Sequence, residues 1–426
     1  MKILIINYRF FVSGGPERYM FNLINLLKSK GHKVIPFSIR YTSNNQSDFS
    51  DYFVSPLSSE KEVYFQDYKL NIRSIKKIIE RLFYSTEVYN NLAHLIIDMK
   101  PDFAIVLHYL KKLSPAVIKC LDDNGIPFIV RISDFLMICP NAHLIRKGKI
   151  CELCIHKGLI NSVKYKCVQN SYSMSLLNYL AIKFHNKKKY FDKIIYFVVP
   201  SKFTIFKMIE AGYDPSRLIH LPTFVDILSQ EIIIERKRQI VFVGRMERIK
   251  GVHILLSAVN HLKNKGVSHF NCLIIGDGDK EYIEELCSFV KVNTLSNVKF
   301  LGKLEKEEID FHLRESLFSV VPSIWYDNQP NTVLESLANG TPVIASNHGS
   351  FPEIVIDNTT GFLFNPNDIL DLAKKINILI DNSELRKKMS YNAIEFIRAN
   401  HSSERHFQIL INIYTKLKTN GLFSQK

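Results

Sequence analysis

Short apolar runs alternate with longer stretches of helical periodicity along almost the whole chain. In the first half the runs are KILIINY, HKVIPFSI, DFAIVLHYL, PFIVRISDF and KIIYFVVPS. In the second half they are QIVFVGR, NCLIIGDG, NVKFLG, LFSVVPS and PVIAS. Near-continuous apolar strands separated by amphipathic helices are typical of parallel sheets that are covered by helices on both faces. The sequence therefore predicts an α/β chain.

The length and one break in this pattern predict two domains. A chain of 426 residues is too long for one ordinary hydrophobic core. Pro222 interrupts the alternation within HLPTFVD, residues 220–226. We therefore expect two Rossmann-like domains, with the first at 1–222 and the second at 223–401. Near the start, SGGPER is predicted to be a loop, and residues 19–30 a helix that ends before Gly31.

The net charge of +15 lies entirely in the first domain. Residues 1–222 contain 32 Lys and Arg against 17 Asp and Glu, whereas the rest contains 24 of each kind. This asymmetry indicates an anionic partner, such as a phospholipid surface, a phosphorylated acceptor or nucleic acid. A solvated basic surface is the alternative. Nucleic acid is disfavoured because the chain lacks the aromatic-interleaved basic pattern of its binding sheets.

No membrane span or secretory signal is expected. The longest apolar stretches fall short of the roughly 18 residues that a spanning helix needs, and KILIINY is too short for a signal sequence. The expected location is the cytoplasm.

The loop VGRMERIKG follows a predicted strand and precedes a predicted helix. Arg245 and Lys250 flank its turn, and the helix begins after Gly251. Two cations beside a helix N-terminus suit a diphosphate. An ordinary basic surface loop is the alternative. The chain has no P-loop pattern, and SGGPER is not the glycine pattern of a dinucleotide site.

The stretch IWYDNQPNTVLESLANG places two carboxylates eight residues apart, Asp327 in a loop and Glu335 in the following helix. The first N–H groups of a helix have no intrahelical partner and can hold a phosphate oxygen. Those groups belong to Asn331, Thr332 and Val333. Glu335 lies one turn after Asn331 and could accept hydrogen bonds from a ribose diol, while Asp327 could reach hydroxyls beyond the phosphates. A solvated helix residue is the alternative for Glu335.

These motifs resemble glycosyltransferase family 4. The similarity rests on VGRMERIKGVHILLSAV, IIGDGD, VKFLG, VPSIWYDNQPNTVLESLANGTPVIASNHGSFPEIV and GFLF, in that order, and on GGPER and DFAIVLHY in the first half. It covers most of the chain. It implies the GT-B fold, with two Rossmann-like domains facing each other across a cleft and a last helix, 402–426, that joins the first domain. It also implies transfer from a UDP- or GDP-sugar with retention of configuration.

The resemblance also implies roles for individual residues. Arg245 and Lys250 would neutralise the donor diphosphate as the leaving group gains charge, so that no metal or other cofactor is required. Glu335 would bind ribose, and Asp327 would act at the transferred sugar. In GDGD, Gly276 and Asp277 would lie near the base, and Gly14 and Gly15 would let the first loop approach the phosphates. Retention would arise by same-face attack; the residues do not exclude a double displacement.

Two positions depart from the family pattern. Asp327 stands where most members carry glutamate. Ser133 stands where many members carry a histidine, although Asp134 after it remains. Serine can donate a hydrogen bond but cannot act as a base near neutral pH. His108, after another strand, is a candidate for the acceptor side or a structural loop histidine. A nucleotide-sugar epimerase or hydrolase and a non-catalytic binding protein therefore remain as alternatives.

Four cysteines cluster within an expected insert at 139–167. Cys139, Cys151, Cys154 and Cys167 could form a four-thiolate zinc site of structural type. Buried thiols without a metal, and disulfide or redox chemistry, are the alternatives.

Two basic amphipathic segments complete the pattern. Residues 69–84 place Leu70, Ile72, Ile75, Ile78, Ile79 and Leu82 on one face, and KFHNKKKYFDK follows apolar residues 176–184. Such segments are typical of helices at an anionic membrane surface. A helix that covers the sheet is the alternative for 69–84. With the charge excess, they favour a peripheral position on the inner face of the membrane and a saccharide or lipid-linked saccharide acceptor, as in surface polysaccharide biosynthesis.

Overall fold

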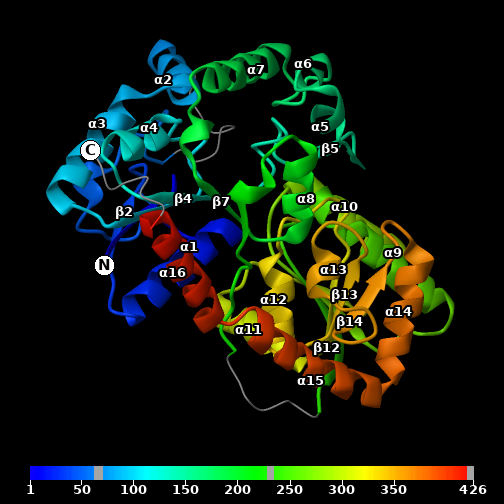
Figure 1. The fold of residues 1–426 in the computed structure, drawn as a ribbon. Coiled ribbons are helices and arrows are strands. Elements are labelled where there is room, and N and C mark those ends of the chain that lie inside the picture. Colours follow the sequence, from blue (N-terminus) through cyan, green and yellow to red (C-terminus); the bar gives the residue numbers. More distant parts are fainter. Residues whose placement is uncertain (62–70, 228–234, 420–426) are drawn as a thin grey trace.

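The computed structural model, which describes residues 1–61, 71–227 and 235–419, contains two parallel sheets of six strands each. Figure 1 shows one α/β unit above the other, with the last helix running between them. Every strand pair in both sheets is parallel. The two-domain α/β architecture predicted from the alternation of apolar runs is therefore confirmed.

The first sheet has the strand order β2-β1-β3-β4-β7-β8. Its strands are β1 (Lys2–Ile6), β2 (Lys33–Phe37), β3 (Phe103–Val106), β4 (Phe128–Arg131), β7 (Tyr196–Val199) and β8 (Leu218–His220). Successive side chains of a strand point to opposite faces. Leu4 and Ile6 accordingly pack with α3 (Thr86–Met99), α4 (Ala116–Asp123) and α8 (Lys202–Glu210). Ile3 and Ile5 pack with α1 (Gly15–Ser29) and α16 (Ser403–Thr419) on the other face.

The second sheet has the order β11-β10-β9-β12-β13-β14. Its strands are β9 (Lys237–Val243), β10 (Asn271–Ile275), β11 (Val298–Gly302), β12 (Ser316–Val321), β13 (Val343–Ser346) and β14 (Gly361–Phe364). Helices α9 (Val252–Asn264), α10 (Lys280–Val292) and α14 (Ile369–Asp381) cover one face. The other face packs against α11 (Lys306–Glu315), α12 (Asn331–Ala338), α13 (Phe351–Ile354) and α15 (Ser383–Asn400).

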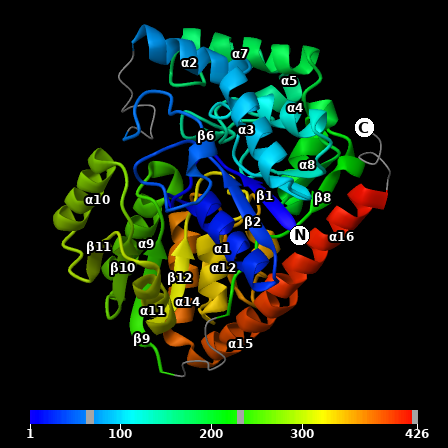
Figure 2. The same ribbon diagram turned by 90° about the vertical axis from the view of Figure 1, so that its left-hand side faces the viewer.

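The last helix returns to the first sheet. Leu410, Ile413 and Leu417 of α16 share a buried cluster with Ile3 and Leu23, and α16 lies alongside α1 in both views (Figures 1 and 2). The expected segment 402–426 extends past the described residues, which end at Thr419. The domain boundary at 222/223 stays a prediction.

The sequence misplaced the start of one helix and missed two strands of the sheets, β8 and β14 (Gly361–Phe364). Helix α1 begins at Gly15 rather than at 19, because Pro16 fits the first turn, where its missing N–H is not needed. Strand β8 lies just before the predicted joint and was not recognised, because three residues that end at His220 give too short a pattern.

A long insertion separates β4 from β7. It contains the hairpin β5 (Ile145–Arg146) and β6 (Lys149–Ile150), the short helices α5 (Leu153–Lys157) and α6 (Asn161–Lys164), and the longer α7 (Tyr172–Lys187). Helix α2 (Ile72–Phe83) packs against α7 at the outer end of the first domain (Figure 1). Within the described ranges, no helix is both long enough and apolar enough to cross a membrane.

Candidate functional site

Each sheet contains a place where the strand order reverses, and the two places define the candidate site. In the second sheet the reversal lies between β9 and β12, and in the first it lies between β1 and β3. Ligands of open α/β sheets bind beyond the carboxyl ends of the strands at such points. The loops after β9 and β12 carry Arg245, Lys250 and Asp327, and His108 follows β3.

Gly251 allows the loops after β9 and β12 to touch. Its φ of 74° is left-handed, and a Cβ there would lie 1.9 Å from the Pro322 carbonyl oxygen. The Ile324 N–H also donates to the Ile249 carbonyl at 2.9 Å. Only glycine combines this conformation with such a close approach. The contact places Lys250 next to the second loop.

Lys250 and Asp327 form a buried ion pair. The ammonium lies 2.8 and 3.0 Å from the two carboxylate oxygens, and the Ser323 hydroxyl donates to the same carboxylate at 3.0 Å. Asp327 is only 7% exposed. The Lys250 ammonium also lies 5.0 Å from the centre of the Trp325 ring. Sequence reasoning placed these residues in one site but did not foresee that they pair with each other.

The Arg245 side chain is exposed to solvent, unlike that of Lys250. Its guanidinium contacts Glu247 at 2.6 Å, and its side chain is 55% exposed. An exposed ion pair exchanges partners at little cost. Arg245 can therefore turn towards an incoming anion without leaving a buried charge uncompensated.

The GDGD loop lies against the backbone on either side of Arg245. At Gly276, where φ is 140°, a Cβ would lie 1.8 Å from the Gly244 carbonyl oxygen. The Met246 N–H donates to the Asp277 carbonyl at 3.0 Å. The structure thus brings Gly276 and Asp277 to the loop that carries the candidate phosphate-binding cation.

Helix α12 meets helix α1 of the first domain. Arg18 donates to Glu335 Oε1 at 2.7 Å, and the Asn331 side chain donates to the Gly15 carbonyl at 3.0 Å. Glu335 is 4% exposed, yet its Oε2 has no hydrogen-bond partner among the described residues. A buried carboxylate oxygen is costly to leave unpaired. It therefore marks a place where a ligand hydroxyl fits.

The expected set of free amides at α12 needs one correction. The Val333 N–H already donates to the Pro330 carbonyl at 3.2 Å, because the first turn tightens into an i to i+3 bond. Asn331 and Thr332 remain as the candidates for binding a phosphate oxygen through their backbone N–H groups.

Gly14 precedes α1 in an extended conformation with φ −175°. Its backbone therefore does not require glycine, unlike that of Gly251.

On the first-domain side, His108 faces Asp134. His108 Nε2 lies 3.2 Å from Asp134 Oδ2. Burial lowers the pKa of His108, but the neighbouring Asp134 outweighs it and the pKa is raised. Burial raises the pKa of Asp134, but contact with His108 outweighs it and the pKa is lowered. Both shifts favour a charged pair. Ser133 is half-buried on the same loop.

The insertion adds a residue that the sequence did not single out. The His143 ring lies 4.9 Å from the Trp325 ring in an edge-to-face arrangement. Arg18, by contrast, stands within the quoted motif GGPER, so a closer reading of that motif could have found it. No local sequence signal marks His143, because its significance depends on a contact across nearly two hundred positions.

The four cysteines of the insertion come near one another without converging on a point. Burial, followed by the other three thiols, raises the pKa of Cys154 to about 12. No three of the four sulfurs belong to a described group of potential ligands whose atoms all lie within 4.8 Å of one another. The zinc site predicted at Cys139, Cys151, Cys154 and Cys167 stays a prediction.

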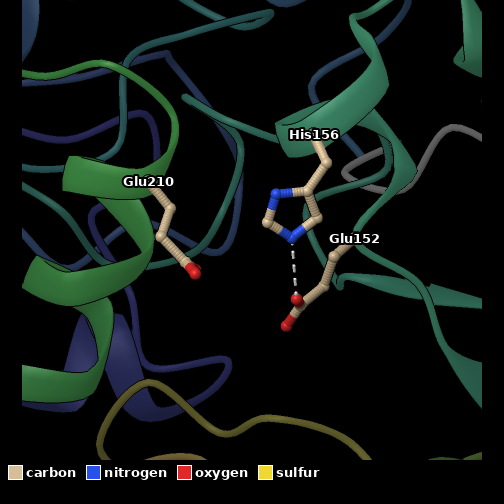
Figure 3. A group of neighbouring side chains, drawn as sticks. All are labelled: Glu152, His156 and Glu210. Atoms are coloured by element: carbon tan, nitrogen blue, oxygen red, sulfur yellow. Dashed lines mark hydrogen bonds and ion pairs between the residues drawn. The ribbon is translucent and has the colours of Figure 1, made fainter.

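The described residues with that spacing are Glu152, His156 and Glu210 (Figure 3). His156 Nε2 lies 3.2 Å from Glu152 Oε2. The Lys207 ammonium, however, lies 2.8 Å from Glu152 and 2.9 Å from Glu210. The cluster therefore already contains its own cation, and we interpret it as a structural ion-pair network rather than as a metal site.

Comparisons with known proteins identify the second domain. Residues 226–396 match the family described as glycosyl transferases group 1. These residues, which make up most of the predicted second domain, are therefore similar to the group 1 glycosyltransferases. A glycosyltransferase of Methanocaldococcus jannaschii is 37% identical to the chain over 155 residues, which are 36% of this chain and 42% of that protein. The match thus covers less than half of the length of this relative.

Solved structures with a similar fold match nearly the whole length of the chain. Sucrose-phosphate synthase from Thermosynechococcus elongatus matches with a TM-score of 0.71 and 16% identity, over 98% of this chain and 99% of that one. An Anabaena protein in complex with UDP-glucose matches with a TM-score of 0.65 and 16% identity, over 99% of both chains. The predicted GT-B fold is confirmed. The assignment to family 4 and the retaining mechanism stay predictions.

Proposed function

We propose that the chain is a retaining glycosyltransferase that moves a hexosyl or related group from a UDP- or GDP-sugar to a saccharide or lipid-linked saccharide. The observation that carries this proposal is Glu335. Its buried, unpartnered Oε2 lies beside the N-terminal turn of α12, on a helix of the group 1 domain. A ribose hydroxyl would supply the missing donor, and the amides of that turn would meet the adjoining phosphate.

The cations of the second domain suit the leaving group. Sugar transfer leaves negative charge on the diphosphate, and fixed positive charge stabilises that charge without a metal ion. Arg245 is free to approach the phosphates. Lys250 has three N–H donors, so it can keep its contact with Asp327 while it donates to a phosphate oxygen. Asp327, held by Lys250 and Ser323, is the candidate for contacts with the transferred sugar.

Nucleotide-sugar binding by a structural neighbour supports a donor of this class. The Anabaena protein with the same fold was solved with UDP-glucose. On the acceptor side, the His108 and Asp134 pair offers one cationic and one anionic group. Such a pair can bind acceptor hydroxyls, and a donor phosphate oxygen can take the acceptor proton in a same-face attack. Growth of a surface polysaccharide is the role that we propose.

Donor binding by two variants tests the proposal. We expect Glu335→Ala and Lys250→Ala each to weaken calorimetric binding of UDP or GDP and their sugars about tenfold or more, because each loses a charge-assisted hydrogen bond. Glu284→Ala and Lys280→Ala, both exposed on α10, serve as matched controls. Wild-type affinity in both site variants would overturn the site. Full-rate donor hydrolysis without any acceptor would instead favour a hydrolase.

We also propose that the outer end of the first domain binds an anionic membrane. Helix α2 exposes Ile72, Ile75 and Ile79, which are 89%, 47% and 42% exposed, whereas its Arg81 is 1% exposed. These three isoleucines face away from the core, which is unusual for a helix that covers a sheet, whereas Leu82 of the predicted stripe is buried. Leu176 and Leu180 of the neighbouring α7 are also exposed. Leu70, part of the predicted stripe, lies outside the described residues.

Vesicle sedimentation tests the membrane proposal. We expect the protein to bind vesicles that contain anionic phosphatidylglycerol, and to bind less at high salt, because basic residues are drawn to anionic headgroups. Ile72→Ser combined with Ile75→Ser should release it. Ile97→Ser, at an exposed isoleucine on α3, is the control. Equal binding to neutral vesicles, or no binding at all, would contradict the proposal.

Zinc remains part of the proposed function only as a structural ion for the insertion. Thiolates bind zinc after they lose their protons, so a metal would reverse the raised pKa of Cys154. Metal analysis of protein purified without chelator should give about one zinc per chain. A content below about a fifth of that would leave the cysteines as buried thiols.

A further inference from the structure

His143 reaches from the insertion of the first domain to the donor loops of the second. Its ring meets Trp325 at a centroid distance of 4.9 Å and an interplanar angle of 67°. The Lys250 ammonium lies 5.0 Å from the centre of the same Trp325 ring. His143 Nδ1 and Trp325 Nε1 are both buried, and neither has a hydrogen-bond partner among the described residues. Two rings in contact therefore each carry a buried, unpaired nitrogen, and one of them lies on the loop that carries Asp327.

The charged groups that act on His143 include three residues of the loop after β9 and one of the acceptor side. Burial lowers its pKa, Asp134 and Glu247 act to raise it, and Arg245 and Lys250 act to lower it further. The imidazole therefore lies within electrostatic range of the proposed diphosphate cations and of the acceptor-side carboxylate.

The backbone around His143 is held in an unfavourable conformation. Ala142 and Leu144, on either side of it, have φ values of 67° and 50°, which non-glycine residues rarely adopt. Asn141 stabilises the turn: its side-chain oxygen accepts from the His143 N–H at 3.0 Å, and its amide donates to the Ile145 carbonyl at 2.8 Å. Backbone strain of this kind is concentrated at ligand-binding positions, where it fixes a side chain in advance.

We propose that His143 binds the transferred sugar of the donor, through a hydrogen bond between Nδ1 and a sugar hydroxyl. The inference rests on the proposed function and names a further residue of the same site. The sugar is the part of the donor that fits, because Trp325 precedes the sugar candidate Asp327 by two positions, whereas Glu335 marks the ribose. A neutral imidazole can donate through one nitrogen and accept through the other, so it can recognise a hydroxyl in either role.

The consequence is a division of donor recognition between the domains. The second domain would bind the nucleotide, and the insertion of the first domain would bind the transferred sugar. Domain contact would then be needed for sugar recognition but not for binding of the free nucleotide.

Calorimetry with UDP or GDP, compared with the nucleotide sugar that the wild-type protein uses fastest, tests this. His143→Phe keeps an aromatic edge against Trp325 but removes both nitrogens. We expect the affinity for UDP or GDP to change less than about twofold. The ratio of nucleotide-sugar affinity to free-nucleotide affinity should fall about tenfold, and kcat/KM should fall about ten- to hundredfold. His143→Gln, which keeps a donor and an acceptor, should recover part of the loss and guards against a folding defect in the Phe variant.

His269→Phe is the matched control, since His269 is 55% exposed and lies near Asp381 on the second domain. Unchanged sugar affinity and turnover in a folded His143→Phe protein would overturn the inference while leaving the glycosyltransferase proposal intact. Loss of nucleotide and sugar affinity to the same extent would also overturn it, because His143 would then act on the nucleotide. A wild-type protein that binds no nucleotide at all would instead refute the proposed function itself.

Discussion

At the scale of single residues, the site depends on charges that are buried and paired. Lys250 and Asp327 have side chains only 17% and 10% exposed. A buried charge that loses its partner keeps its desolvation cost but loses the compensating attraction. The same pair therefore contributes to folding stability as well as to the proposed chemistry.

We predict strong coupling between these two residues. Asp327→Ala should destabilise the protein by about 3 kcal/mol, because it leaves the Lys250 ammonium without its counter-charge. Lys250→Ala in that background should cost much less than it does alone, with a coupling energy of about 2 kcal/mol in a urea-unfolding cycle. The exposed Lys387 and Glu384 pair, 2.9 Å apart, should couple by less than about 0.5 kcal/mol. Additive effects at Lys250 and Asp327 would show that the pair is not coupled in solution.

At the scale of elements, two loops and one helix start make the site, and Gly251 joins the loops. Gly251→Ala would force either a backbone shift or a clash with the Pro322 carbonyl, whose oxygen would lie 1.9 Å from the new Cβ. Gly266 offers a matched comparison, because its φ of 82° is similar but nothing lies within 4 Å of a Cβ there.

We predict that Gly266→Ala costs about 1 kcal/mol, from the left-handed conformation alone. Gly251→Ala should cost at least about 2 kcal/mol more, because the steric conflict adds to the strain. It should also weaken nucleotide binding, since Lys250 would move. Denaturant unfolding and calorimetry on both variants measure this, and equal losses would mean that the close approach is relaxed easily.

At the scale of the whole molecule, the domains are joined where α16 crosses back. His406 Nδ1 lies 2.8 Å from the Pro222 carbonyl oxygen and His406 Nε2 lies 3.1 Å from the Tyr19 hydroxyl. His401 Nδ1 lies 2.8 Å from the Thr223 carbonyl oxygen. Burial lowers the pKa of His406 to about 3 and that of His401 to about 4. Both imidazoles are therefore neutral in the folded protein.

Because the pKa values of these two histidines are lowered, we predict that the protein loses folding stability in mild acid. Below an ordinary histidine pKa of about 6.5, the unfolded chain binds protons that the folded chain does not, so stability falls as the pH drops from 6.5 towards 4. Each histidine should contribute about 2 kcal/mol of loss by pH 5. His406→Phe should flatten the dependence of the unfolding free energy on pH between 6.5 and 5, whatever its effect at pH 7. An unchanged slope would mean that His406 takes up its proton without unfolding.

The sequence predicted most of the fold because its signals are local. Apolar runs marked most strands of the two sheets, but β8, β14 and the first turn of α1 were missed, where Leu218–His220 and Gly361–Phe364 are short and Pro16 begins a helix. The site residues on the second domain were proposed for a similar reason, since loops after neighbouring parallel strands must meet at one edge. Whether those residues act as proposed awaits the experiments above.

By itself the sequence determined the two α/β domains, because the periodicity of strands and helices is a local signal, and its motifs determined the resemblance that implied the GT-B fold. Only the tertiary structure decided which charges pair. The contact of Arg18 with Glu335, the contact of His143 with Trp325 and the presence of Lys207 between two carboxylates join residues from distant parts of the chain. Such contacts depend on how the two domains and the insertion pack, and no local pattern encodes that packing.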